Sequence, residues 1–142
     1  MDMTSASGAI SRHDLERMDK HAEIYYEQIR KRTSDIQSIA KNTNFSVEDI
    51  KKIKNHIFFT YHDLGAEIPL RFTPSYDMAV SWQRLIGGRN IQEMDIVMLK
   101  HELCEIELMA EGVDFDTAHR QADHKHSYAK YLRVLDAREG IY

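Results

Sequence analysis

Residues 92–111, QEMDIVMLKHELCEIELMAE, decide the fold of this chain, because their apolar side chains recur on two faces of one predicted helix. With successive residues about 100° apart on a helical wheel, one face carries Ile96, Leu99, Leu103, Ile106 and Ala110. The opposite face carries Met94, Val97, Met98, Leu108 and Met109. Charged residues fill the flanks between them, with Asp95 and Glu102 together on one flank. A helix with two apolar faces is expected at the centre of an all-α, compact multi-helix domain.

His101 and Glu105 interrupt the second apolar face, one helical turn apart. Burying an imidazole and a carboxylate in an apolar surface costs several kcal/mol unless the groups are paired, hydrogen-bonded or bound to a metal. Three interpretations follow from the spacing. The two residues form a structural pair, they act as metal ligands or an acid–base pair, or they are simply exposed.

The next predicted helix returns alongside this one as a C-terminal antiparallel hairpin. Gly112 ends the helix, and Asp114 or Asp116 caps a last helix that is predicted to run to about Ala137. If the turn centres at 113–114, residues on the two helices pair in antiparallel register.

This register brings several potential ligands to one level of the hairpin. His101 lies level with His126, Glu105 lies level with Ala122, and His119 shares a face with His126. Facing helices commonly build metal sites from such N and O ligands. We therefore predict that His101, Glu105 and His119 bind a divalent ion, zinc or manganese, with His126 as a further candidate.

The segment HELCE, residues 101–105, is similar to the HExxH zinc helix of metalloproteases but has Glu105 where the second His belongs. Those enzymes need both His residues on zinc and the Glu between them as the base. Here Glu102 lies about 100° from His101 on the charged flank. Peptide hydrolysis is therefore disfavoured.

The rest of the chain also has helical periodicity. Helices are predicted over 11–32, 35–41, 46–59 and 77–86. Ser46 is the expected N-cap of the third. Residues 60–76 contain Gly65 and both prolines and form the longest predicted loop, in which 68–72 could form a short β-ribbon. We predict a flexible leader over 1–10 and one helical domain over 11–142.

Composition narrows the functional classes. With 42% hydrophobic and 30% charged residues, the 142-residue chain has the composition of a globular domain. Its formal charge of −4 gives no global basic field for nucleic acid, although a local basic strip could still bind it. The lone Cys104 excludes an internal disulfide and suits a reducing cytoplasm. No apolar stretch approaches the ~20 residues of a membrane span, so no membrane partner is expected.

Two weaker patterns could also contribute to a site. His62 and Asp63 lie next to each other in the long loop and could join a metal site, or they could only cap the loop. Arg84, with Arg71 and Arg89, could hold a phosphate by bidentate contacts, or these side chains could be solvated at the surface.

A family resemblance runs from Phe45 to Tyr128. Its motifs are HDLG at 62–65, RF at 71–72, YDMA at 76–79, SWQRL at 81–85, LKHEL at 99–103 and AH at 118–119. In these motifs the chain resembles the C-terminal domains of bacterial polymorphic toxins and of phage minor-head proteins, which carry a HELxE…AH motif.

The resemblance implies a modular effector domain. Such a domain would be made in the bacterial cytoplasm, delivered to another cell as part of a larger secreted protein, and neutralised by a cognate immunity protein. Five residues match the polar positions of the family motifs: His62, Asp77, His101, Glu105 and His119. His126 stands where the family has Asn.

Two functional hypotheses result. The first is a toxin-type, metal-dependent hydrolase in which Glu102 or Asp77 orients the attacking water. A phosphodiester substrate, and so a nucleic acid, is favoured over a peptide. The second is a non-enzymatic interaction or structural module of a phage or secretion system, in which the His–Glu cluster only fixes the register of the helices.

Overall fold

A computed structural model of the chain describes residues 11–132, and all structural statements refer to this range. The predicted leader over 1–10 and residues 133–142 lie outside it. The helices are α1 (Arg12–Lys31), α2 (Asp35–Asn42), α3 (Val47–Lys54), α4 (Tyr76–Gly87), α5 (Glu93–Ala110) and α6 (Phe115–Lys125). A π-helical turn, η1 (Asn55–Phe59), continues α3, and a 3-10 turn, η2 (Ala129–Tyr131), follows α6. The all-α prediction is confirmed for the described residues.

Capping side chains explain where most of these helices begin. The first N–H groups of a helix have no acceptor within it, so a preceding polar side chain stabilises the first turn. Side-chain oxygens of four N-cap residues accept such a bond: Ser11, Ser46, Ser75 and Asp114. The capping role predicted for Ser46 is therefore confirmed, and Asp114 rather than Asp116 caps α6.

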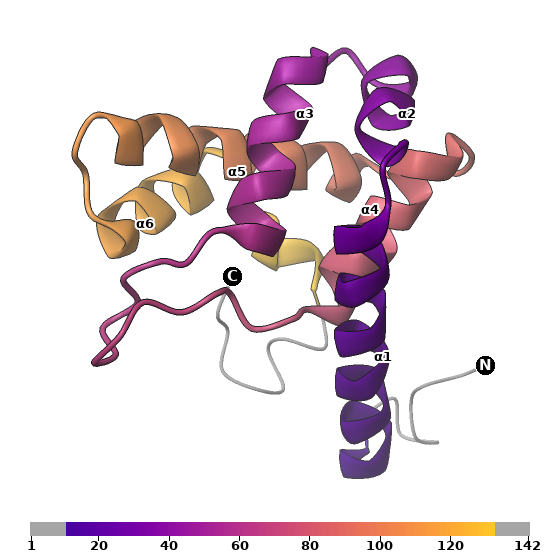
Figure 1. The fold of residues 1–142 in the computed structure, drawn as a ribbon, viewed down its shortest axis with the longest axis horizontal. Coiled ribbons are helices and arrows are strands. Elements are labelled where there is room, and N and C mark those ends of the chain that lie inside the picture. Colours follow the sequence, from indigo (N-terminus) through magenta and orange to yellow (C-terminus); the bar gives the residue numbers. More distant parts are fainter. Residues whose placement is uncertain (1–10, 133–142) are drawn as a thin grey trace.

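The long helix α5 lies in the middle of the bundle, as its two apolar faces predict. It packs against α3, α4 and α6, and the chain turns after α5 so that α6 lies beside it (Figure 1). The helix α1 packs on α4 and η1 and extends away from the bundle (Figure 1). No helix within residues 11–132 is long and apolar enough to cross a lipid bilayer.

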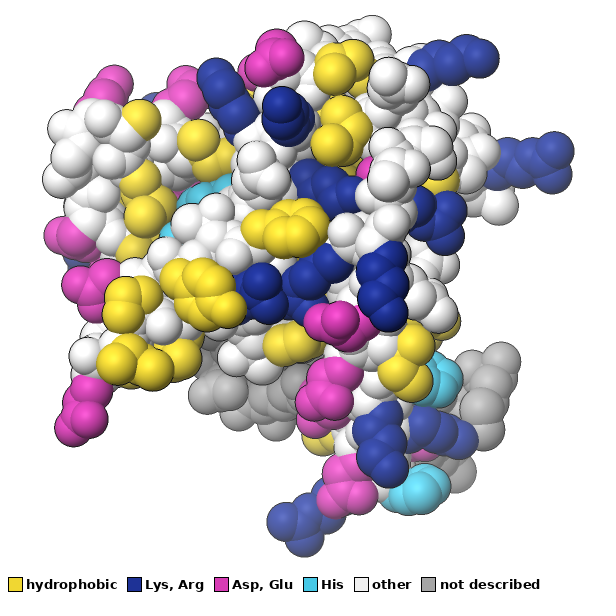
Figure 2. All heavy atoms as spheres, in the orientation of Figure 1, with side chains coloured by type: hydrophobic (Ala, Val, Ile, Leu, Met, Phe, Trp, Pro, Cys, Tyr) yellow, Lys and Arg dark blue, Asp and Glu magenta, His cyan; other side chains and the backbone are white. Residues whose placement is uncertain are grey.

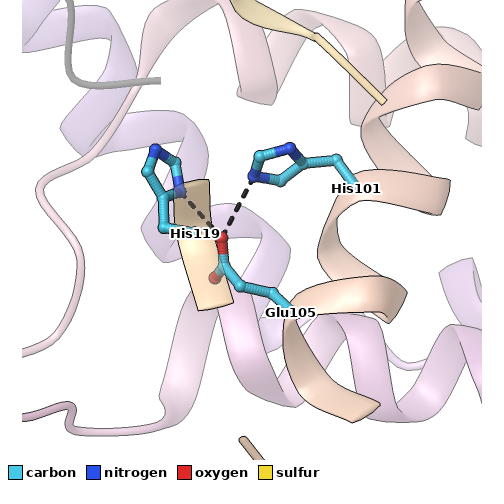
Figure 3. Close-up of side chains that lie close together, drawn as sticks. All are labelled: His101, Glu105 and His119. Atoms are coloured by element: carbon cyan, nitrogen blue, oxygen red, sulfur yellow. Dashed lines mark hydrogen bonds and ion pairs between the residues drawn. The ribbon is translucent and has the colours of Figure 1, made fainter. Parts of the chain in front are cut away.

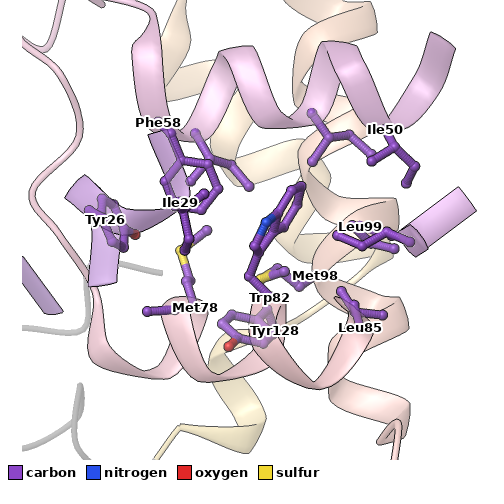
Figure 4. Close-up of a cluster of buried hydrophobic side chains, with 14 of the residues drawn as sticks. Tyr26, Ile29, Ile50, Phe58, Met78, Trp82, Leu85, Met98, Leu99 and Tyr128 are labelled. Atoms are coloured by element: carbon purple, nitrogen blue, oxygen red, sulfur yellow. The ribbon is translucent and has the colours of Figure 1, made fainter. Parts of the chain in front are cut away.

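The hydrophobic core centres on Trp82 of α4, which is fully buried. Its ring meets Phe58 of η1 edge to face at 5.2 Å between centroids, and Phe58 meets Tyr26 of α1 in the same way at 4.7 Å. Figure 4 shows Leu99 of α5 among the side chains around Trp82. The core therefore joins α1, η1, α4 and α5 through one continuous cluster.

A buried charged network ties three helices together beside this core. Asp35, at the start of α2, accepts hydrogen bonds from Lys54 Nζ of α3 at 2.8 Å and from Trp82 Nε1 of α4 at 3.0 Å. Both Asp35 and Lys54 are buried. A buried ion pair survives only when nearly every polar atom has a partner, and Lys54 also donates to Arg32 O at 2.8 Å.

The burial of α5 differs from the prediction on one flank. Asp95 and Glu102, which were expected on a charged, solvated flank, are both buried. Asp95 is buried because Arg84 of α4 donates two hydrogen bonds to it, at 2.9 and 2.7 Å. Arg84 of α4 covers Asp95, whereas His56 of η1 lies beside Glu102, and the pattern of α5 alone reveals neither neighbour.

The predicted end of the last helix is wrong, and the possible β-ribbon is not confirmed. The last helix ends at Lys125 rather than near Ala137, because the chain leaves helical geometry at His126, with φ −137° and ψ 82°. This bend returns Tyr128 to the core, where its hydroxyl is 2.9 Å from that of Ser81. In the long loop, the part of the chain described contains one isolated antiparallel bridge, 62 with 70, in place of a β-ribbon over 68–72.

We expect Lys54→Met to lower the free energy of unfolding by about 3 kcal/mol, since it leaves Asp35 with a buried charge that has lost its ion-pair partner. The matched control is Lys51→Met, on the exposed face of the same helix, which should change stability by less than about 0.5 kcal/mol. Urea unfolding followed by circular dichroism measures both. Equal stability of the two variants would contradict a structural role for the network.

Candidate metal centre

The buried carboxylate of Glu105 on α5 is the hub of a histidine cluster. Its Oε2 lies 3.0 Å from His101 Nε2 and 2.8 Å from His119 Nδ1. Figure 3 shows both rings pointing at this oxygen. Its Oε1 lies 2.7 Å from His56 Nε2. One carboxylate therefore contacts three imidazoles that come from three elements.

The local structure explains how these side chains meet. His101 and Glu105 are one turn apart on α5, so they share a face. The chain then turns back through Gly112, whose φ of +95° suits glycine and is strained for other residues. After that turn α6 packs on α5 and presents His119. His56 arrives from the other side, on the π-helical turn η1.

His101 is held by hydrogen bonds at both ring nitrogens. Its Nδ1 lies 3.1 Å from the backbone oxygen of His126, opposite the contact with Glu105. Burial alone lowers the pKa of His101, but the hydrogen bond to Glu105 and the charges of Glu102 and Glu105 raise it to about 9. A carbonyl oxygen behind a ligand histidine orients the other ring nitrogen toward a metal.

The two buried glutamates have opposite pKa shifts. Burial opposes ionisation of Glu105, but the hydrogen bonds from His101, His119 and His56 outweigh it and hold the pKa of Glu105 well below its usual range. Burial and the charge of Glu105 raise the pKa of Glu102 to about 7. Glu102 Oε2 lies 3.6 Å from His56 Nε2 and has no hydrogen-bond partner within the described residues.

Within residues 11–132, two groups of side chains could hold a metal ion. His101, Glu105 and His119 form the first, and His56, Glu102 and Glu105 form the second. In each group the potential ligand atoms lie within 4.8 Å of one another. Zinc binds N and O ligands at about 2.0–2.2 Å, so small side-chain shifts would accommodate it. Three protein ligands leave a coordination position free for water or substrate.

A cavity of about 250 Å³ borders this cluster. It is lined by Leu64, Phe72, Thr73, Met78, Glu102, Phe115, Asp116 and His119. His119 stacks on Phe115 at 5.4 Å between ring centroids, and Phe115 lies 5.3 Å from Phe72. The cavity therefore has an aromatic wall and also contacts one member of each ligand group, His119 of the first and Glu102 of the second. A small molecule within it could reach a metal bound to either group.

The structure brings together the three residues predicted as metal ligands. It places the fourth candidate, His126, differently, since His126 contributes its backbone oxygen to His101 rather than its ring. Glu102, predicted beside the site as a catalytic group, is buried next to the cluster and lines the cavity.

Among the described residues, the other predicted candidates belong to neither ligand group. His62 is buried next to the cluster, but its Nε2 contacts the backbone oxygen of His56 at 2.9 Å. Asp63 is exposed and accepts a hydrogen bond from the backbone of Gly65. Asp77 lies in the first turn of α4 and, among the described residues, joins neither ligand group and does not line the cavity.

The structure also changes the interpretation of two side chains. Arg84, a candidate phosphate contact, is occupied by its bidentate pair with Asp95. His56 was missed as a member of the cluster, because no spacing relates it to α5 or α6. One feature of the sequence could have indicated His56: it lies on the apolar helix that precedes His62. This position predicts that the rings of His56 and His62 are neighbours. Their centroids are 4.6 Å apart.

Comparisons of the chain with protein-family models, with curated proteins and with solved structures find no significant match. The function is therefore inferred from the geometry and chemistry of the cluster.

We expect Glu105→Gln to lower the stability of chelator-treated protein by about 3–5 kcal/mol, since it removes the charge that three imidazoles share, those of His56 and His101 being buried. Glu107→Gln, on the exposed side of the same helix, is the matched control and should have an effect below about 0.5 kcal/mol. Chemical unfolding at neutral pH measures both. If Glu105→Gln and the wild type unfold at the same denaturant concentration, the buried histidines do not need the carboxylate for stability.

Proposed function

We propose that this protein is a metal-dependent hydrolase whose divalent ion, zinc or manganese, binds to His101, Glu105 and His119. The observation that carries the proposal is the convergence of two histidines and a carboxylate oxygen beside a cavity. A bound divalent ion would lower the pKa of its water ligand and polarise the bond to be cut. His101 and His119 would hold the ion, and the backbone oxygen of His126 would fix the orientation of His101.

Glu102 is the best candidate for orienting the attacking water. It is buried, it lines the cavity beside His119, and its Oε2 has no hydrogen-bond partner within the described residues. A carboxylate oxygen in that position could accept a proton from a metal-bound water. Asp77, the alternative from the sequence, does not line this cavity.

A phosphodiester is the substrate class that we favour. The aromatic wall formed by Phe72 and Phe115 could stack on a nucleobase or another flat group. No Lys or Arg is among the lining residues described, so the metal would supply the positive charge that a phosphate needs. On the face seen in Figure 2, Lys and Arg side chains gather between α3 and the upper end of α1, which gives a polyanion a local basic patch despite the net charge of −4.

The biological setting that we propose is a toxin-type effector. This part of the proposal is supported only by the resemblance of the HELxE…AH motif, of which Glu105 and His119 are cluster members. It implies a cognate immunity protein that would block the cavity or its metal.

Elemental mass spectrometry of untagged protein, purified without chelator, tests the metal site. We expect at least one zinc or manganese ion per chain in the wild type and the loss of one ion in His101→Ala, because a ligand is removed. His124→Ala, an exposed histidine on α6, is the control and should keep the metal. Wild-type protein without metal, even after incubation with zinc or manganese, would contradict the proposal and leave the cluster as a structural polar core.

Glu102→Gln tests the hydrolase chemistry. We expect it to lower turnover of a model phosphodiester, bis(p-nitrophenyl) phosphate, by a factor of about 10²–10⁴, and to abolish growth inhibition when the domain is expressed in bacteria. The ion held by His101 and His119 should remain. Glu107→Gln is again the control. Wild-type activity in Glu102→Gln would exclude Glu102 as the water-orienting group, and a metal-loaded wild type without activity on phosphodiesters would overturn the substrate class.

A further inference from the structure

The proposed metal ion uses only one oxygen of Glu105. The other oxygen, Oε1, belongs to a second ligand group, since it lies 2.7 Å from His56 Nε2. That nitrogen lies 3.6 Å from Glu102 Oε2. We infer that the cluster binds two divalent ions bridged by the carboxylate of Glu105, with the second ion on His56 and Glu102. This inference rests on the proposed function and extends it.

The two ligand groups use different oxygens of Glu105, as a carboxylate that bridges two metal ions requires. His101 and His119 both approach Oε2, whereas His56 approaches Oε1. A carboxylate whose two oxygens have different partners can place one metal on each oxygen. Two-metal hydrolase sites hold their ions about 3.5–4 Å apart, which is the separation that a bridging carboxylate allows.

The second group contains an oxygen without a hydrogen-bond donor among residues 11–132. Glu102 is 5% exposed, and its Oε2 accepts no hydrogen bond within the described residues. Leaving a carboxylate oxygen buried without a donor is costly. An ion between Glu102, His56 and Glu105 would satisfy this oxygen, and these residues are all buried.

The backbone holds His56 in place for this role. The π-helical turn widens the helix, so that the Thr60 N–H bonds to Asn55 O at 2.8 Å. His62 then contacts the backbone oxygen of His56 and packs against its ring. π-helical turns within α-helices occur frequently at functional sites, where they reorient one side chain.

A second ion also gives the site a charge that matches an anionic substrate. Two divalent ions would face two carboxylates, Glu102 and Glu105, which leaves a net positive charge for a hydroxide and a phosphate to neutralise. The cavity is lined by Glu102 from one group and His119 from the other, so a phosphate there could reach both ions. Two ions can stabilise the attacking and the leaving oxygen together, and Glu102 would then act on the water through its ion.

Manganese loading of the whole chain tests the inference. Protein is stripped with chelator, loaded with Mn²⁺, freed of excess metal, and examined by elemental mass spectrometry and electron paramagnetic resonance. We expect two Mn²⁺ per chain and the multiline spectrum of an exchange-coupled pair. His56→Gln, or the size-conserving Glu102→Gln if the former does not fold, should lower the content to one and give a six-line spectrum. His124→Gln should keep both ions.

The outcomes separate this inference from the proposed function. One uncoupled Mn²⁺ in the wild type, lost in His119→Gln and retained in His56→Gln, would overturn the second ion and leave the proposed hydrolase site standing. Two ions that persist in both His56→Gln and Glu102→Gln would overturn the assigned ligands. No bound Mn²⁺ in the wild type would overturn both.

Discussion

A carboxylate buried among three imidazoles is the interaction on which the candidate site depends. Glu105 is 1% exposed, and taking its charge out of water is tolerated only because donors reach both of its oxygens. Those donors come from α5, α6 and η1, so all three elements must meet at one point. Displacing α6 or η1 by one turn would remove one of the three donors from this buried charge. The hydrogen bonds that the buried carboxylate needs therefore also fix how α5, α6 and η1 pack together.

A second set of buried charges holds the framework around this point. The ion pair between Asp35 and Lys54 fixes the end of α3, and Lys54 lies two residues before His56. The bidentate pair between Arg84 and Asp95 joins α4 to the first turn of α5. The aspartate of each pair is buried, so removing its basic partner lowers the free energy of unfolding strongly. These two ion pairs position the helices that carry the candidate metal ligands, and they make no contact with those ligands.

The sequence predicts the helices well, because capping residues and apolar periodicity are local signals. It also predicts that His101, Glu105 and His119 lie close together, since a short hairpin fixes which residues face each other. It cannot predict that His56 joins them, because a π-helical turn and a packing contact with α5 place it there. It misplaces Glu102, since a helical wheel does not say which polar flank a neighbour will cover. It extends the last helix too far, because the contact of Tyr128 with Ser81, which follows the bend at His126, is purely tertiary.

The hydrogen bonds around Glu105 determine which neighbouring ring nitrogens carry protons, and this bears on the metal binding that we propose. Carbonyl and ionised carboxylate oxygens only accept hydrogen bonds, so without metal both ring nitrogens of His101 must carry protons to reach His126 O and Glu105. His56 and His119 must likewise each donate a proton to Glu105. Each proton that lies between a histidine nitrogen and an oxygen of Glu105 occupies a position where a cation could bind instead. Such a cation would contact the same nitrogen and the same oxygen. Exchange of protons for a divalent ion would preserve each charge contact and return His101 to the neutral form that ligates metals. In the two-ion site that we propose, Glu102 Oε2, which accepts no hydrogen bond within the described residues, would ligate the second ion.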